Sequence, residues 1–156
     1  MAIAKKLKDY LKKNKIEFQV LQHPVAHSAP RIAAAQHVPG HQMVKPVIVE
    51  TDGTYVMCVL TADHLLDLSK IKKLTGAKQV NLATEEEIAQ LFPDFEVGAE
   101  PPFGNLYGLA VYTDAHVPDN KEIYFNGGNH TELVKIRCHD FMELVKPVVA
   151  DFGRHV

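Results

Sequence analysis

The strongest fold signal in the chain is the stretch VKPVIVETDGTYVMCVL, residues 44–60. Two runs rich in apolar and β-branched residues, Val44 to Glu50 and Tyr55 to Leu60, flank a short polar segment that contains Asp52-Gly53. Asp-Gly between two such runs is a characteristic signal of a β-hairpin. The sequence therefore predicts two antiparallel strands joined by a tight turn.

Helices and strands are mixed irregularly on both sides of this hairpin. Apolar spacing predicts helices over residues 2–14, 28–37, 65–74 and 140–145, and a capping box at Thr84–Glu87 predicts another. Further strands are expected over residues 16–21, 109–112, 122–125 and 131–136, and residues 92–105 are expected to be irregular. Because helices and strands do not alternate steadily, we expect a single α+β domain over residues 1–156 with a mixed, mostly antiparallel sheet.

Composition and charge narrow the function classes. The 156 residues include 46% apolar and 23% charged residues, as in ordinary globular proteins, and no apolar run approaches a membrane span. No secretory signal is evident, and two isolated cysteines indicate reduced thiols, so we expect a cytoplasmic protein without a membrane partner. A net charge of −2 argues against DNA as a partner. Cys58 is expected to be buried in the hairpin.

Lysines gather in two segments of this weakly acidic chain. Six lie within residues 5–15, and four lie within residues 70–78. Such clusters are usually solvated helix faces, but they can also form a local patch that meets phosphates. Both interpretations remain open from the sequence.

Lys45 stands at the start of an apolar strand. A cation in that position must be neutralised, held at an edge or directed at an anionic ligand. Two glycine-rich stretches elsewhere in the chain, residues 97–104 and 126–131, offer bendable backbone with N–H donors. Together these features predict a small site that binds a charged, polar ligand.

Several common kinds of site lack support in the sequence. The nine histidines form no HExxH or Cys/His pattern, so they are interpreted as scattered surface residues and no metal is expected. No GxSxG elbow, P-loop or GxGxxG motif occurs, so a serine nucleophile or a nucleotide cofactor is not expected either. We expect no cofactor.

Several short motifs, taken in order, resemble those of the YbaK/prolyl-tRNA-synthetase-associated family of aminoacyl-tRNA deacylases. They are His23-Pro24, Val44-Lys45, residues 61–68 (TADHLLDL), Gly76-Ala77-Lys78, the GxxxP loop of residues 98–102, and Asn126-Gly127-Gly128. The resemblance spans nearly the whole chain. Glu100-Pro101 departs from many members of the family, in which smaller residues are common.

The resemblance implies hydrolysis of the ester that joins a mischarged amino acid to the tRNA 3′-terminal ribose. It also implies a mostly antiparallel, partly barrel-like sheet with packed helices, in a free-standing protein. Lys45 and Gly98 match the lysine and the loop glycine of the family. The implied partner is the 3′ end of aminoacyl-tRNA, together with an aminoacyl-tRNA synthetase.

Lys45, Gly98 and His130 are assigned catalytic roles. Lys45 is expected to fix the terminal nucleotide, through its phosphate or near the ester. N–H groups near Gly98 and Gly128 are expected to face the carbonyl oxygen, and His130 is the candidate for positioning or activating water. The ribose 2′-hydroxyl is the alternative activating group. Substrate contacts are further expected from Met43, Pro102, Phe103, Gly104, Gly127, Gly128 and Asn129.

Two other functions remain open from the sequence. One is a catalytically inactive module of the same fold that binds a tRNA end or a nucleotide. The other is a small hydrolase that acts on a different ester or amide.

Overall fold

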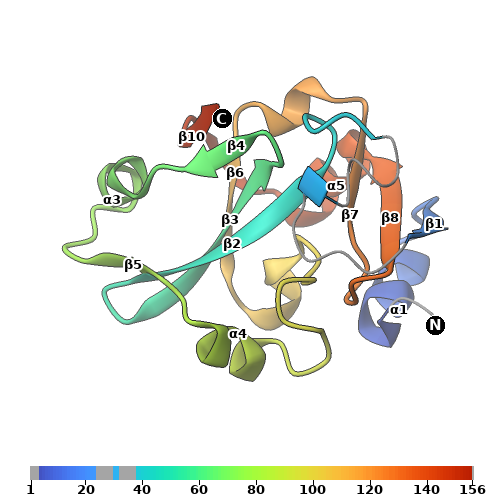
Figure 1. Ribbon diagram of the computed structural model, residues 1–156, viewed down its shortest axis with the longest axis horizontal. Helices are drawn as coiled ribbons and strands as arrows, with labels where there is room; N and C mark the ends of the chain where they lie inside the picture. The colour runs from blue at the N-terminus through green and yellow to red at the C-terminus, as the bar shows by residue number, and fades with distance from the viewer. Residues whose placement is uncertain (1–3, 24–29, 32–37, 156) are drawn as a thin grey trace.

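The computed structural model describes residues 4–23, 30–31 and 38–155 (Figure 1). The helices are α1 (Lys5–Lys13), α3 (Leu68–Thr75), α4 (Glu85–Leu91) and α5 (Cys138–Val145), and the 3₁₀ turns are η1 (Gly104–Tyr107) and η2 (Val117–Asp119). The strands are β1 (Gln19–Gln22), β2 (Val44–Thr51), β3 (Thr54–Thr61), β4 (His64–Leu66), β5 (Val80–Leu82), β6 (Ala110–Asp114), β7 (Glu122–Asn126), β8 (Glu132–Arg137), β9 (Val148–Ala150) and β10 (Gly153–His155). None of these helices is long and apolar enough to span a membrane.

The predicted hairpin is the centre of the largest sheet. β2 and β3 pair in antiparallel register from Val44 opposite Thr61 to Thr51 opposite Thr54. β5 extends this hairpin on one side and β6 and β9 extend it on the other, in the order β5-β2-β3-β6-β9. β3, β6 and β9 run parallel to one another, whereas β2 and β5 are antiparallel to their neighbours. The sheet is therefore mixed.

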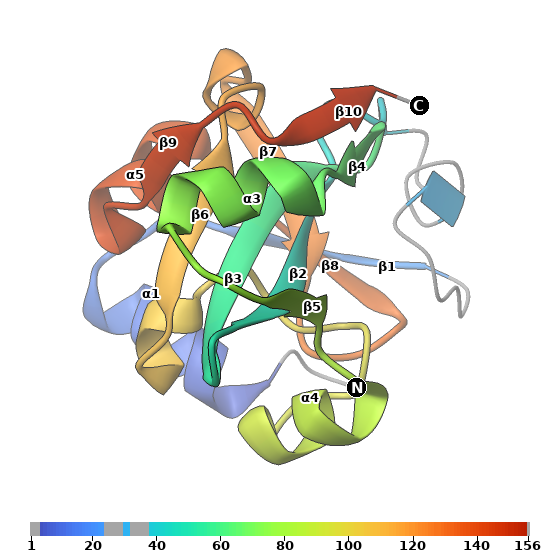
Figure 2. The same cartoon turned by 90° about the vertical axis from the view of Figure 1, so that its left-hand side faces the viewer.

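Side chains on β3 enter the core on both faces of this sheet, which explains its uninterrupted apolar run. Val56, Cys58 and Leu60 pack against α3 and against Phe152, near the C-terminus. Met57 and Val59 point to the other face, where the larger core contains side chains from α1 and α5 and the phenylalanine rings of residues 92, 103, 125 and 141. Figure 2 shows α3 in front of the sheet and α1 behind it.

A second sheet, of three strands in the order β1-β8-β7, lies beside the first. A parallel bridge between Met43 and Tyr124 links the two sheets where β2 begins. The described strands do not close into a barrel, and β4 and β10 form a separate two-stranded sheet. The predicted α+β class with mostly antiparallel pairing is confirmed.

Most of the predicted elements are present with shifted bounds. Thr84 forms the predicted capping box with Glu87, and Gly76 ends α3 in the left-handed conformation. The helix predicted over residues 28–37 lies outside the described residues except for Pro30 and Arg31, which are helical. The prediction of a helix from Leu65 is wrong, because residues 64–66 form β4, and Asp67 caps a helix that begins only after it.

β4 is a strand because the C-terminal segment returns to pair with it. β10 lies antiparallel to β4, with Gly153 opposite Leu66. Asp114, whose side chain is fully buried, accepts hydrogen bonds from the backbone N–H groups of Phe152 and Gly153 at 3.0 and 2.7 Å. This pairing joins residues that are far apart in the chain, so the local apolar pattern does not reveal it.

Candidate functional site

The two predicted glycine-rich stretches lie against each other. Gly128 donates its N–H to the carbonyl of Ala99 at 3.1 Å, and Glu96 donates its N–H to the carbonyl of Gly128 at 2.9 Å. The backbone N–H of His130 donates to the Glu96 carboxylate at 3.2 Å. We call residues 96–100 the Gly98 loop and residues 127–130 the Gly128 turn. Their hydrogen bonds make them one rigid unit.

The ring of His130 adds a further link within this unit. Its Nε2 lies 2.9 Å from the carbonyl oxygen of Val97, and only 6% of the residue is exposed. Because a carbonyl only accepts hydrogen bonds, Nε2 carries the proton in this contact. A methyl group at Gly98 would lie 3.4 Å from Cε1 of this ring. The imidazole therefore packs against Gly98 and holds the loop through its hydrogen bond to Val97.

Two positions in this unit require glycine. Gly98 has φ of +88° and Gly128 has φ of +97°, a region that disfavours side chains with a Cβ. At Gly128 a Cβ would also lie 2.9 Å from Ala4 and from the Phe95 ring. The glycines therefore set the path of both segments, which accounts for the composition seen in the sequence.

A cavity of about 360 Å³ opens between the Gly98 loop and β2. Its polar lining includes Lys45, Glu100 and Asn126, and its apolar wall is built by β2 and by the residues from β5 to α4. The described residues that line it are Pro30, Lys45, Pro46, Val47, Ile48, Leu82, Ala83, Ile88, Gly98, Glu100 and Asn126. The sequence prediction that Lys45 and the Gly98 loop meet at one site thus agrees with their placement.

Lys45 is the only cationic side chain among the described residues that line this cavity. Burial lowers the pKa of its ammonium group, and the attraction of Asp63 offsets part of this shift. Within residues 4–23, 30–31 and 38–155, no carboxylate comes within 4.0 Å of its nitrogen in an ion pair. The ammonium is therefore half-buried, open to the cavity and not engaged in a structural ion pair there.

Glu100 and Asn126 also reach this cavity, although the sequence analysis did not place their side chains in the site. Glu100 is 4% exposed, and its Oε1 accepts the N–H of Gly98 at 2.9 Å. Burial raises the pKa of its carboxyl group, against the opposing effect of that hydrogen bond. The available sequence signal was an acidic residue inside a glycine- and proline-rich loop, at a position where the resemblance implies smaller residues in many members of the family.

The expected backbone donors are already in use in this conformation. The Gly98 N–H donates to Glu100, and the Gly128 N–H donates to the carbonyl of Ala99. The N–H of Gly127 donates to the carbonyl of Glu132 at 3.0 Å. The N–H groups of Gly98, Gly127 and Gly128 themselves are therefore not free to face an ester carbonyl in this conformation, and the prediction for N–H groups near Gly98 and Gly128 stays a prediction.

The other residues expected to contact substrate do not line this cavity. Met43 is fully buried and packs against Ala62 and Leu133. Phe103 lies in the main core, and Gly104 is packed against Met57. Pro102 is buried, and Asn129 is 5% exposed and donates from Nδ2 to the Glu132 carboxylate at 3.1 Å. These residues contribute to the frame of the site.

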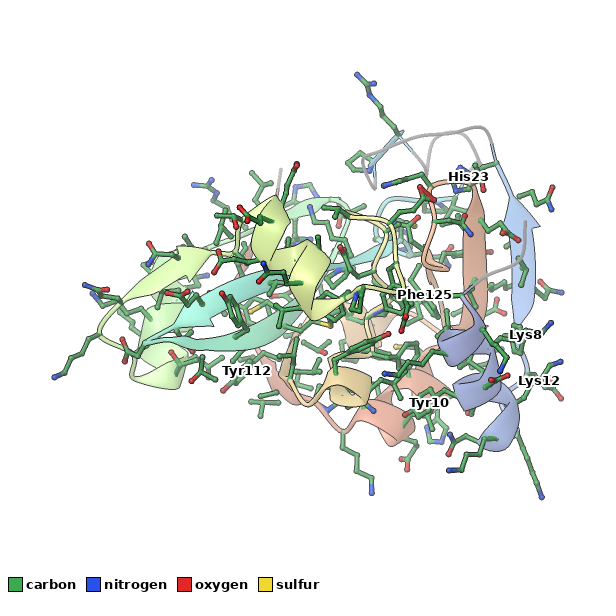
Figure 3. All side chains as sticks on the ribbon, turned by 90° about the horizontal axis from the view of Figure 1, so that it is seen from below. Lys8, Tyr10, Lys12, His23, Tyr112 and Phe125 are labelled. Carbon is green, nitrogen blue, oxygen red and sulfur yellow. The ribbon has the colours of Figure 1, made fainter. Side chains whose placement is uncertain are left out.

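The lysine-rich helix α1 begins beside the Gly128 turn. The N–H of Ala4 donates to the carbonyl of Gly127 at 2.9 Å, which fixes the start of the helix. Leu7 and Leu11 are buried, whereas Lys8 and Lys12 extend from the helix on its outer side (Figure 3). Lys6 lies 3.9 Å from the centre of the Tyr107 ring. A basic surface therefore adjoins the unit that carries Gly98.

Histidines are less scattered than the sequence analysis expected. His23, His64 and His130 are at most 6% exposed, so describing them as surface residues is wrong. His64 stacks on His116 with ring centres 4.3 Å apart, next to a second cavity of about 410 Å³. Within the part of the chain that the structure describes, no group of three His, Cys, Asp or Glu side chains is arranged to hold a metal ion.

Both cysteines are buried, as expected for Cys58. Burial raises the pKa of the Cys58 thiol to about 12 and that of the Cys138 thiol to about 11. Thiols with such values are protonated at neutral pH and are poor nucleophiles. Neither lines the cavity that contains Lys45.

Comparisons with known proteins agree with this geometry. One relative is the Multifunctional Ser/Thr-tRNA deacylase ProXp-y of Escherichia coli (strain K12), which is 24% identical over 143 residues, covering 88% of this chain and 85% of the relative. The Proline--tRNA ligase of Xylella fastidiosa (strain Temecula1 / ATCC 700964) is 33% identical over 85 residues, but this match covers only 14% of the ligase.

A solved structure has the same fold. The crystal structure of a candidate trans-editing enzyme for prolyl-tRNA synthetase superposes with a TM-score of 0.86 at 24% identity, covering 97% of this chain and 96% of the other. The family model described as "Aminoacyl-tRNA editing domain" matches residues 23–144, which include Lys45, the Gly98 loop and the Gly128 turn. The chain therefore belongs to the aminoacyl-tRNA editing domain family.

Proposed function

We propose that the protein hydrolyses the ester bond of mischarged aminoacyl-tRNA in trans and releases the free amino acid and the tRNA. The observation that carries this proposal is the shared cavity of Lys45 and the Gly98 loop, in a chain of the editing-domain family. The match to the deacylase of Escherichia coli, over most of both chains, supports action on a separate tRNA substrate. In this proposal the domain comprises residues 1–156.

Lys45 holds the anionic end of the substrate in this mechanism. Its ammonium is a compact cation with three donors, which suits the phosphate of the 3′-terminal nucleotide. An aminoacyl ester is already activated, so positioned water and a polar cavity suffice without a covalent nucleophile. The acyl side chain lies against the apolar wall, to which Val47, Ile48 and Ala83 contribute.

Water activation is assigned to the ribose 2′-hydroxyl. His130 is not among the described residues that line the cavity, and its Nε2–H donates to the carbonyl of Val97, so the ring holds the Gly98 loop in place. The 2′-hydroxyl is adjacent to the ester in every substrate and needs no protein base. His130 is thus a positioning residue in this proposal, and Gly98 shapes the loop.

The biological use of such a cavity is a second selection step. A synthetase gains only about 1–3 kcal/mol of discrimination per methylene, so small wrong amino acids are attached to tRNA. A separate cavity that accepts the smaller acyl group removes them. We infer an aminoacyl-tRNA synthetase as the source of the substrate and the cytoplasm as the compartment, since charged tRNA is made and used there.

Hydrolysis of a panel of mischarged tRNAs under single-turnover conditions tests the proposal. We expect at least one to be deacylated well above its spontaneous rate. The Lys45→Ala variant is expected to lose about 100-fold in rate, the typical cost of removing one preorganised donor. The control is Lys73→Ala, since Lys73 is an exposed lysine of α3 outside the cavity.

The same panel separates the competing functions. Binding of tRNA without turnover of any substrate would identify an inactive binding module. Equal hydrolysis of aminoacyl esters that lack the tRNA would identify a general ester hydrolase. An unchanged rate for Lys45→Ala would remove Lys45 from the mechanism.

A further inference from the structure

We propose that Glu100 and Asn126 bind the α-ammonium group of the aminoacyl moiety, so that the cavity selects tRNA esters with a free amino group. This inference rests on the proposed function and assigns a second recognition site within the same cavity. It concerns two residues whose side chains the sequence motifs do not single out.

Glu100 is a buried carboxylate without a cationic partner. It is 4% exposed, and no lysine, arginine or histidine forms an ion pair with it among the described residues. Burying an unpaired carboxylate costs free energy, so proteins usually pair such groups. Burial raises the pKa of this carboxyl group, and the charge of His130 opposes this shift only as the smallest contribution, without an ion pair. A cationic ligand would supply the missing partner.

The loop holds this carboxylate in a defined orientation. Oε1 accepts the Gly98 N–H at 2.9 Å, within the unit that the Gly128 turn and His130 brace. Among the described residues, Gly98 is the only other residue that donates a hydrogen bond to this carboxylate, and the backbone N–H of Glu100 itself also stabilises its charged form. Because Glu100 lines the cavity, one oxygen is anchored and the other remains available to a ligand.

Asn126 offers a second acceptor in the same cavity. The residue is 5% exposed, and its Oδ1 is buried without a hydrogen-bond partner among the described residues. An ammonium group donates three hydrogen bonds and accepts none. The Glu100 carboxylate and Asn126 Oδ1 therefore match the donors of such a group.

The charges of the cavity match an aminoacyl-tRNA end. Lys45 is the one cation and Glu100 the one acid among its described lining residues. Among the described residues, no ion pair within 4.0 Å joins the two side chains, so each can meet its own group of the ligand. An aminoacyl-tRNA terminus carries a phosphate and, at neutral pH, a substantially protonated α-amino group. N-blocked esters such as peptidyl-tRNA have the phosphate but lack the cation.

The test compares the best substrate of the mischarged-tRNA panel with its N-acetylated form. Each enzymatic rate is divided by the spontaneous rate of that ester, and substrate saturation separates kcat from KM. We expect the wild-type protein to prefer the free-amine ester by about 10- to 100-fold, the range for a hydrogen bond to a charged group. Glu100→Gln is expected to lose this preference by slowing the free-amine ester alone.

Two further variants complete the experiment. Asn126→Ala is expected to reduce the same preference, which gives an independent result if Glu100→Gln folds poorly. Glu143→Gln makes the same chemical change at an exposed position on α5 and is expected to keep the full preference. Thermal melting of each variant checks that it is folded.

The outcomes distinguish this inference from the proposed function. Equal hydrolysis of the free and acetylated esters by the wild-type protein would overturn the ammonium site and leave the deacylase intact. An equal loss on both esters in Glu100→Gln would also overturn it, because a general catalytic or loop role would then explain the effect. If the wild-type protein hydrolyses no free-amine ester, the proposed function itself fails.

Discussion

Nε2 of His130 lies 2.9 Å from the carbonyl oxygen of Val97, the residue that precedes Gly98. The backbone N–H of the same histidine reaches Glu96, at the start of the Gly98 loop. His130 therefore binds both the backbone carbonyl of Val97 and the side-chain carboxylate of Glu96 in the Gly98 loop. The geometry gives His130 a supporting part, and this part can be tested separately from proton transfer.

We expect His130→Ala to lower the single-turnover rate by about 10- to 100-fold, because small displacements of a positioned site have effects of that size. The shape of the pH–rate profile should stay unchanged, since His130 is not among the described residues that line the cavity. The control is His139→Ala, at an exposed position on α5. Loss of an inflection that the wild-type profile possesses would instead identify His130 as the general base.

Gly98→Ala is expected to destabilise the fold by about 1–2 kcal/mol, the cost of a left-handed conformation for an L-residue. The matched control is Gly108→Ala, because Gly108 has φ of +74° and open space around its Cβ position. Both variants should lose similar stability in denaturant titrations, but only Gly98→Ala should lose deacylation. Equal activity in the two variants would contradict the role of the Gly98 loop.

Asp114→Asn is expected to loosen the C-terminal strand and to cost about 1.5–3 kcal/mol of unfolding free energy, as for hydrogen bonds to a charged group. The buried carboxylate accepts from Phe152, Gly153 and both the N–H and the ring of His116. An asparagine amide turned toward His116 presents donors where acceptors are needed. Urea titration at neutral pH measures this difference.

The pH dependence of stability follows from the same contact. Burial opposes ionisation of Asp114, but the hydrogen bonds to its carboxylate outweigh burial and lower its pKa. The contribution of Asp114 to the free energy of unfolding is therefore full above about pH 4 and is lost as the pH falls through the lowered pKa. The hydrogen bond to Asp114 raises the pKa of His116 from 6.5, so that contribution is full below 6.5 and lost as the pH rises through the raised value.

The pair should therefore stabilise the protein most between about pH 4 and 6.5. The melting temperatures of the wild-type protein and Asp114→Asn should differ most in this range. His116→Ala should abolish the loss of stability at alkaline pH and keep the loss of stability at acidic pH. A constant difference between the wild-type protein and Asp114→Asn from pH 3 to 9 would exclude this linkage.

Lysines of α1 are expected to contact tRNA phosphates. The triple variant Lys5→Ala, Lys6→Ala, Lys8→Ala should bind tRNA more weakly and reduce the slope of log affinity against log salt by about 0.7 per lost single-strand contact. The control triple variant replaces Lys70, Lys72 and Lys73 of α3. Unchanged affinity and slope in the α1 variant would return these lysines to an ordinary solvated helix face.

The sequence predicted the elements whose signals are local. The Asp52-Gly53 turn specifies the hairpin, and the Thr84 capping box specifies the start of α4, because neighbouring residues supply all the hydrogen bonds involved. β4 and β10 were not predicted, since each depends on the other across the length of the chain. Residues 65–66 have apolar side chains that fit a helix equally well until this pairing is known.

The same distinction applies to the site. Lys45 and the Gly98 loop were predicted because a cation at a strand start and a Gly-Pro loop are unusual in any context. Glu100 and Asn126 were missed as cavity residues, because their significance comes from burial and from an acceptor without a partner. Local sequence also does not reveal that the Gly98 N–H is consumed by a side chain two residues later.

Part of the apolar wall shares β2 with Lys45, whereas the rest of the wall and the acidic group Glu100 come from other parts of the fold. Val47 and Ile88 belong to β2 and α4, whereas the Gly98 loop and the Gly128 turn are locked to each other by their own hydrogen bonds. Exchanging wall residues outside β2, such as Ile88, therefore changes the size of the accepted acyl group without altering the strand that carries Lys45. A few substitutions in the apolar wall can therefore change which amino acid is accepted while the catalytic mechanism stays the same.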